Sequence, residues 1–204
     1  MTTITLPTRP LPIATPRRPL LQRAGVPALL LGGPLALAFH LLYGLGHGPT
    51  VVNEHGVVLG LTNDQWSQVG VTWRLLVLVG VLAVGSLHAS RLARTATGLL
   101  VSGLLVSIVA TWVWPLYAAA TILEFSGLAC LAVAVVREQV LPRWSGRVLW
   151  LPVLAFLPLP LAPEVVVSAE WTVADFLLQS EDLIAASVAV AWVGLGLGLA
   201  RARR

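Results

Sequence analysis

The sequence has no lysine, a single cysteine and few charged residues of any kind. The low fraction of charged residues excludes several classes of protein. Charged residues make up 11% of the chain and hydrophobic residues 57%, with a mean hydropathy of +0.86. Soluble domains are about 45–50% apolar and about 25% charged, because polar groups must cover their surface. The composition therefore excludes a soluble enzyme, a disordered protein and a collagen-like fibre, and it favours an integral membrane protein.

The basic residues and the cysteine give little sign of chemistry. All 13 basic residues are arginine, which is typical of a GC-rich genome and favours a bacterial source. They stand at the ends of apolar runs, so the net charge of +4 does not indicate nucleic-acid binding. Cys130 is alone, so it can form neither an intrachain disulfide nor a cysteine-based metal site. We interpret it as a small packing residue.

Six apolar segments predict six membrane-spanning helices. A helix needs about 20 mostly apolar residues to cross the hydrocarbon core, and barrel strands of about 10 residues are shorter than these runs. The expected fold is an all-α, polytopic membrane helix bundle in one transmembrane domain, residues 23–204, after a disordered, Pro- and Arg-rich cytoplasmic tail, residues 1–22. The predicted spans are 26–46, 71–90, 96–114, 117–136, 146–163 and 183–200.

The positions of the arginines predict the orientation of these spans, because cytoplasmic loops are enriched in basic residues. With six spans and a cytoplasmic N-terminus, all arginines but Arg74 fall on the cytoplasmic side. We therefore expect both termini in the cytoplasm and a location in the inner membrane of a bacterium. The cytoplasmic set is Arg9, Arg17, Arg18, Arg23, Arg91, Arg94, Arg137, Arg143, Arg147, Arg201, Arg203 and Arg204.

A longer outer segment connects the first two spans. The run Asn53-Glu54-His55-Gly56 favours a hairpin turn between residues 50–52 and 57–59. The run Thr62-Asn63-Asp64 then favours the start of a helix, with Trp66 at the membrane interface.

A second outer segment connects spans five and six and carries acidic residues. Asp175, Gln179 and Asp182 share one helical face, at positions i, i+4 and i+7. The set is either a solvated helix face or an acidic lining at a cation entrance.

Three ionisable residues inside predicted spans are the main site candidates, since charged groups in a membrane are costly and tend to serve function. At about 1.5 Å per residue, Glu124 lies about 10 Å, His40 about 9 Å and Arg74 about 5 Å below the outer ends of their spans. We expect them in one shallow layer. They form either a proton-coupled or ligand-binding site, or a hydrogen-bond network that clamps the helices together.

The other histidines do not predict a cofactor site. His88 lies toward the opposite end of its span from the depth of His40, which disfavours a haem held between the two. His47, Glu54 and His55 match no metal-binding spacing. The sequence has no phosphate loop, no His-Glu-x-x-His and no Gly-x-Ser-x-Gly motif. We therefore expect no cofactor, no bound metal and no catalytic residue.

Prolines interrupt the fifth predicted span, at Pro152, Pro158, Pro160 and Pro163. An interior proline removes a backbone hydrogen bond and clashes with the preceding turn, so a regular helix is hard to maintain past Phe156. The segment either has a kinked end or is a broken helix of the kind that marks binding sites in transporters.

Small residues at four-residue spacing favour close approach of helix backbones, inside the bundle or between subunits. They are Gly98 and Ser102, and then Gly103, Ser107 and Thr111, in span three; Ser126, Cys130 and Ala134 in span four; and Gly194 and Gly198 in span six.

These features predict an integral membrane protein without catalysis of its own, acting as a subunit or regulatory partner of a membrane assembly. Its partners would be the lipid bilayer and, through the small-residue faces, another membrane protein or a second copy, with no nucleic acid. One alternative is a small solute transporter, or the substrate-binding membrane subunit of a transporter, with an outward-facing site. Another is a membrane-embedded lipid-modifying enzyme with His40 and Glu124 as its acid–base pair.

Overall fold

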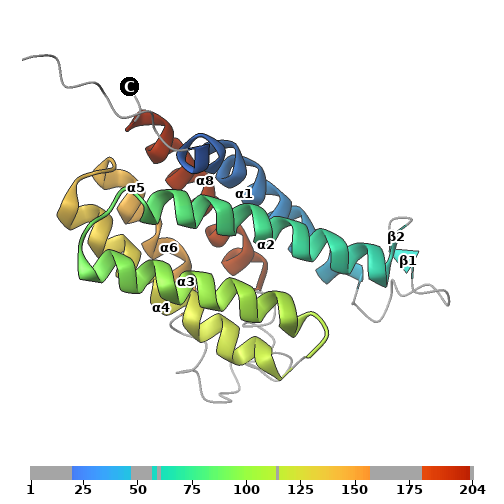
Figure 1. Ribbon diagram of the computed structural model, residues 1–204. Coiled ribbons are helices and arrows are strands. Elements are labelled where there is room, and N and C mark those ends of the chain that lie inside the picture. Colours follow the sequence, from blue (N-terminus) through green and yellow to red (C-terminus); the bar gives the residue numbers. More distant parts are fainter. Residues whose placement is uncertain (1–19, 47–56, 59–60, 114, 157–180, 203–204) are drawn as a thin grey trace, which may run out of the picture.

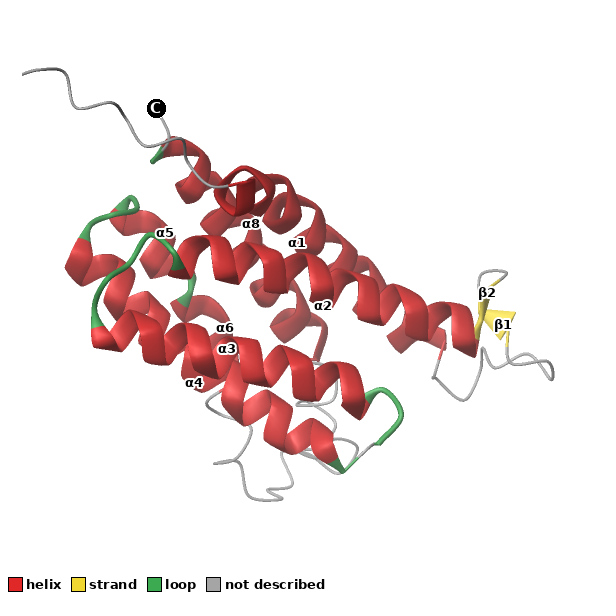
Figure 2. Ribbon diagram, in the orientation of Figure 1, coloured by secondary structure: helices red, strands yellow, loops and turns green. Residues whose placement is uncertain are grey.

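The computed structural model describes residues 20–46, 57–58, 61–113, 115–156 and 181–202, which form a helical bundle with one short β-hairpin (Figures 1 and 2). Two short helices follow the fourth long helix. The long helices are α1 (Leu20–Gly46), α2 (Asn63–Gly85), α3 (Arg91–Ala110), α4 (Leu116–Glu138) and α8 (Glu181–Arg201), and the short ones are α5 (Arg143–Val148) and α6 (Trp150–Phe156).

Five helices in the described part of the chain are long and apolar enough to cross a membrane, as a multi-pass membrane protein requires. They are α1, α2, α3, α4 and α8. The predicted span 146–163 is described only as far as Phe156, and it is divided there between α5 and α6. Each of these two helices is too short to cross the bilayer alone, so the six-span count stays a prediction.

Several helices begin earlier than their apolar runs. Helix α2 begins at Asn63 and not at residue 71, because Thr62 and Gln65 form a capping box. The Thr62 amide donates to Oε1 of Gln65 at 2.8 Å, and the Gln65 amide donates to Oγ1 of Thr62 at 3.4 Å. Helix α3 begins at Arg91 and not at 96, because Oγ of Ser90 accepts from the Ala93 amide at 3.1 Å.

The N-terminal boundary also differs from the prediction. Helix α1 begins at Leu20, so the last three residues of the predicted disordered tail, residues 1–22, are helical.

A short β-hairpin precedes α2. Strand β1 (Val57–Val58) pairs antiparallel with β2 (Leu61–Thr62), with Val57 opposite Thr62. Among the described residues, the partner of β1 is therefore the strand that follows it, and residues 50–52 lie outside the described part of the chain. The predicted turn at Asn53–Gly56 lies outside the described residues.

One end of the bundle brings together chain segments that are rich in arginine. Near the start of α1, Gln22 donates to Ser86 of the α2–α3 turn at 3.4 Å. Ser90 of the same turn bonds to Glu138 at the end of α4, and Arg201 at the end of α8 lies 5.6 Å from the Trp144 ring centroid in α5. Seven arginines with exposed side chains belong to these segments: Arg23, Arg91, Arg94, Arg137, Arg143, Arg147 and Arg201. We call this the arginine-rich end; the side of the membrane that it faces stays a prediction.

Helices α3 and α4 form an antiparallel hairpin whose backbones touch at glycines. A Cβ atom at Gly127 of α4 would lie 2.9 Å from the backbone nitrogen of Leu100 in α3. In α8, a Cβ atom at Gly194 would lie 3.0 Å from the Val148 side chain of α5. These small residues therefore serve packing inside the bundle.

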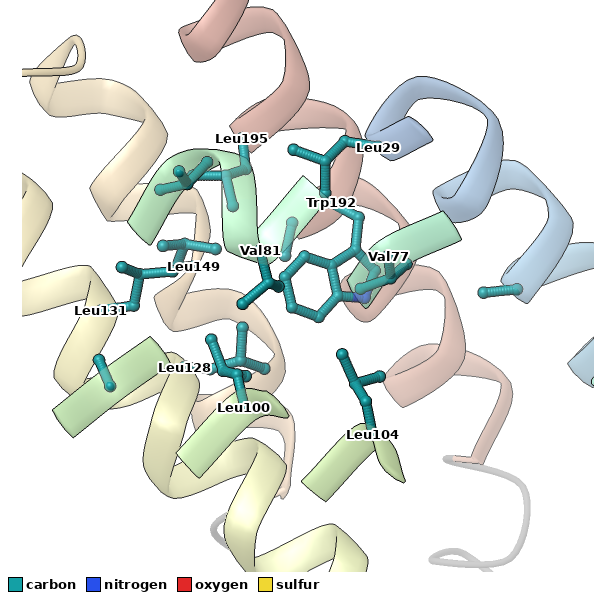
Figure 3. Close-up of a cluster of buried hydrophobic side chains, with 14 of the residues drawn as sticks. Leu29, Val77, Val81, Leu100, Leu104, Leu128, Leu131, Leu149, Trp192 and Leu195 are labelled. Atoms are coloured by element: carbon teal, nitrogen blue, oxygen red, sulfur yellow. The ribbon is translucent and has the colours of Figure 1, made fainter. Parts of the chain in front are cut away.

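The centre of the bundle is apolar. Trp192 of α8 is 1% exposed and lies among side chains from α1, α2, α3 and α4 (Figure 3). The surrounding side chains include Leu29, Val77, Val81, Leu100, Leu104 and Leu128, all buried. This layer separates the polar residues at the two ends of the bundle.

Candidate functional site

Arg74 is a buried cation that ties three helices together. Its side chain on α2 is 2% exposed, yet its donors find oxygen partners. Nε donates to Oγ of Ser107 on α3 at 2.7 Å, and Nη2 donates to the hydroxyl of Tyr117 on α4 at 3.3 Å. Nη1 donates to the carbonyl of Gly70, one turn earlier on α2, at 3.0 Å.

Aromatic rings cover the guanidinium group. Its carbon lies 4.6 Å from the ring centroid of Trp73 and 5.9 Å from that of Phe39 on α1. Cations are attracted to the faces of aromatic rings, and more strongly where water is absent. Gly70 makes room for this arrangement, since a Cβ atom there would lie 3.1 Å from Nη1 of Arg74 and 3.0 Å from Phe39.

Glu124 of α4 completes the cluster through Ser107. The Ser107 hydroxyl, which accepts from Arg74, also interacts with the Glu124 carboxyl group, and Arg74 attracts the negative charge of Glu124. Oε1 of Glu124 is buried, and it has no hydrogen-bond partner among the described residues. We call Arg74, Ser107, Tyr117 and Glu124 the Arg74–Glu124 site.

The sequence-predicted residues are placed unequally around this site. Arg74 and Glu124 lie in one cluster. The exposed side chain of His40 packs on the aromatic residues that flank Arg74, with ring centroids 5.4 Å from Phe39 and 6.0 Å from Trp73. His40 is therefore beside the cluster, on its solvent or lipid side.

The acidic helical face predicted before the last span lies mostly outside the described residues. Asp175 and Gln179 lie outside the described residues, and only the helical backbone of Asp182 is described, in α8.

Ser107 and Tyr117 are site residues that sequence reasoning missed. The four-residue spacing from Gly103 predicts only helix packing for Ser107, and the predicted site residues do not include Tyr117. The signal was present for Tyr117, because it precedes Glu124 by seven positions, which is two helical turns on the same face.

A second polar cluster lies at the arginine-rich end. Nδ1 of His88, in the α2–α3 turn, lies 3.0 Å from Oε2 of Glu138 at the end of α4. Ser90 donates a short hydrogen bond to Oε1 of the same carboxyl group. His88 is 6% exposed, and its Nε2 atom is buried without a partner within the described residues. We call these three residues the His88–Glu138 site.

The described residues of these sites do not form a metal-binding group. Within residues 20–46, 61–113, 115–156 and 181–202 there is no group of three His, Cys, Asp or Glu side chains that could hold a metal ion. A cavity of about 390 Å³ between α1, α5 and α8 is lined by apolar side chains, among them Pro34, Trp144 and Leu197. None of its lining residues belongs to either polar site.

Comparison with known proteins gives no family. No family model matches the chain, and neither the curated proteins nor the solved structures include a significant match.

Proposed function

We propose that the protein is a small solute transporter, or the substrate-binding membrane subunit of one, in which Glu124 binds and releases a proton. The observation that carries this proposal is the buried Oε1 atom of Glu124, which has no hydrogen-bond partner among the described residues although a cation lies nearby. A network that served only to clamp helices would be expected to satisfy its buried polar atoms.

Protonation of Glu124 would change how α4 is held. An ionised carboxylate only accepts hydrogen bonds and is attracted to Arg74, whereas the protonated acid is neutral and becomes a donor. Taking up a proton therefore weakens the tie between α4 and the Arg74 side chain of α2. By linkage, any motion of α4 away from α2 changes the proton affinity of Glu124 in return. This reciprocity is what a proton-coupled transporter needs.

Infrared difference spectroscopy tests the protonation directly. The protein is placed in lipid nanodiscs, and the carbonyl band of protonated carboxylic acids is followed as the pH changes. We expect a titrating band that disappears in Glu124→Gln and persists in Asp64→Asn, a matched acid-to-amide change at an exposed position. A titrating band that is identical in wild type and Glu124→Gln contradicts the proposal.

Proton flux in sealed vesicles tests the transport part. Purified protein is reconstituted into proteoliposomes with an internal pH-sensitive dye, and an imposed pH gradient drives flux in the presence of candidate solutes. We expect Glu124→Gln to reduce solute-dependent flux to the level of empty vesicles. Asp64→Asn should retain the wild-type rate.

A second candidate function is that of a subunit in a membrane assembly. It is favoured by the face of α3 that points away from the rest of the bundle. Gly98 and Ser102 are exposed there, and a Cβ atom at Gly98 would have nothing within 4 Å. Glycine and serine four residues apart let a second helix approach closely and offer it a hydroxyl group. Oxidative crosslinking of Ser102→Cys in a Cys130→Ala background tests this, with the exposed Leu154→Cys on α6 as control. Equal crosslinking of the two variants contradicts it.

A further inference from the structure

The two polar sites draw the same kinds of residue from the same three helices, at opposite ends of the bundle. In each, α2 or the turn after it supplies a basic residue, α3 or its N-cap supplies a serine, and α4 supplies a glutamate. The first set is Arg74, Ser107 and Glu124, and the second is His88, Ser90 and Glu138. The bases are fourteen positions apart, as are the glutamates, which corresponds to about 21 Å along a helix.

Each site also leaves one buried polar atom without a partner among the described residues. In the first site it is Oε1 of Glu124, and in the second it is Nε2 of His88. Both atoms belong to groups that can gain a proton. The two sites therefore share their residue types and a buried titratable group, although Ser107 accepts from Arg74 whereas Ser90 donates to Glu138.

The hydrogen bonds of Glu138 identify the atom of His88 that can take up a proton. An ionised carboxylate only accepts hydrogen bonds, and Glu138 accepts one from Ser90 on one oxygen. Its other oxygen faces Nδ1 of His88, so Nδ1 carries a hydrogen and donates it. Nε2 is then the nitrogen with a lone pair in the neutral imidazole.

No other described charge pairs with this site. Among the described residues, the only salt bridge that involves His88 or Glu138 is the one between them. From α1, the neutral Gln22 reaches the same turn through Ser86. The charged residues on the adjoining segments all have exposed side chains: Arg23 on α1, Arg91 and Arg94 on α3, Arg137 on α4, and Arg143 and Arg147 on α5.

We propose that His88 and Glu138 form a second proton-binding site, which takes up its proton at Nε2 of His88. The proton comes from hydronium, which leaves as water, and the resulting imidazolium is neutralised by the Glu138 carboxylate. The apolar layer around Val77, Val81 and Leu104 separates this site from Glu124 (Figure 3). Each site therefore exchanges protons with its own end of the bundle. The assignment of one proton site to each end of the bundle rests on the proposed function, whereas proton binding at His88 does not.

Nitrogen NMR of the histidine side chains tests the binding step. The full chain is labelled with 15N-histidine, placed in nanodiscs and measured across the range in which imidazoles change charge, about pH 5–8. The chain has four histidines, and loss of a signal in His88→Gln assigns the resonance. We expect Nε2 of His88 to change from a lone-pair nitrogen to a protonated one as the pH falls. A His88 resonance that stays the same throughout overturns the proposal.

A second variant guards against misfolding of His88→Gln. In Glu138→Gln, the amide preserves the shape of the side chain but does not neutralise an imidazolium. We expect a smaller fraction of charged His88 at each pH than in wild type, with Asp64→Asn unchanged. An equal charged fraction in Glu138→Gln and wild type shows that the carboxylate does not assist, and it overturns the site as proposed.

Flux measurements separate this inference from the proposed function. In proteoliposomes, His88→Gln and Glu138→Gln should reduce solute-dependent proton flux while the infrared band of Glu124 remains. If the Glu124 band titrates but both variants keep wild-type flux, the second site has no part in transport, and the assignment of one proton site to each end of the bundle is overturned. If no Glu124 band titrates, the proposed function fails, and the NMR result alone decides proton binding at His88.

Discussion

Gly103 of α3 lies directly against Glu124 of α4. A Cβ atom added at Gly103 would lie 2.7 Å from Cγ of Glu124 and 2.9 Å from its backbone nitrogen. The position of the Glu124 carboxyl group beside Ser107 therefore depends on a residue without a side chain on the neighbouring helix.

Gly103→Ala should push α3 and α4 apart and destabilise the bundle. Overpacking of a well-packed interior typically costs about 1–3 kcal/mol. The matched control is Gly98→Ala on the same helix, where the new methyl group meets nothing within 4 Å, so this variant should only gain the helix preference of alanine, about 0.5–1 kcal/mol. Denaturant titration of both variants in micelles measures the difference, and equal stabilities would show that the close contact is absent.

Arg74→Met should destabilise the protein by leaving Glu124 buried without its cation. Arg74 also donates to Ser107 and Tyr117, and each buried polar group left without its partner costs about 1–3 kcal/mol. The double variant Arg74→Met, Glu124→Gln should recover part of this loss, since no lone charge remains. A double-mutant cycle on the unfolding free energies measures the coupling. Strictly additive losses would show that the two residues do not interact.

Ser90 has two roles that two substitutions can separate. Its side chain caps α3 through the Ala93 amide and also donates to Glu138. Ser90→Ala loses both roles, and the cap alone is worth about 0.5–2 kcal/mol. Ser90→Asp keeps a good cap but places a second carboxylate beside Glu138. If Ser90→Asp is as stable as wild type by chemical denaturation, the bond to Glu138 contributes nothing.

The orientation of the bundle can be read by thiol labelling of intact cells. In a Cys130→Ala background, Asp64→Cys should react with a membrane-impermeant maleimide from outside. Arg91→Cys and Arg143→Cys, at the arginine-rich end, should react only after the membrane is permeabilised, because basic segments favour the cytoplasm. Labelling of Arg91→Cys in intact cells would reverse the predicted topology.

Most of the helices could be predicted, because the features that determine them, apolar runs and capping residues, are local in the sequence. Apolar runs of sufficient length predicted helices in α1, α2, α3, α4 and α8, and the run Thr62-Asn63-Asp64 predicted the start of α2. The register of β1 was not predictable in the same way. Its partner depends on which neighbouring residues close the turn, and the sequence offers turn-forming residues on both sides.

The site was harder to predict because depth along a helix does not fix which side chains meet. Counting residues along each helix predicts similar depths for Arg74, His40 and Glu124. The rotation of each helix about its axis then decides which of these side chains are in contact. Ser107 joins Arg74 to Glu124 because α3 packs between them. His88 and Glu138 are in contact because the α2–α3 turn lies beside the end of α4. The spacing of residues within a single helix does not predict such a contact.

The order of the helices along the chain has a consequence for biosynthesis. Arg74 belongs to α2, whereas the residues that bond to it across the bundle, Ser107 and Tyr117, belong to the later helices α3 and α4. A ribosome therefore delivers this arginine to the insertion machinery before either partner exists. Until the α3–α4 hairpin follows, its charge must be held at the lipid headgroups or by a chaperone, and truncation between α2 and α3 should leave a nascent chain that is poorly integrated.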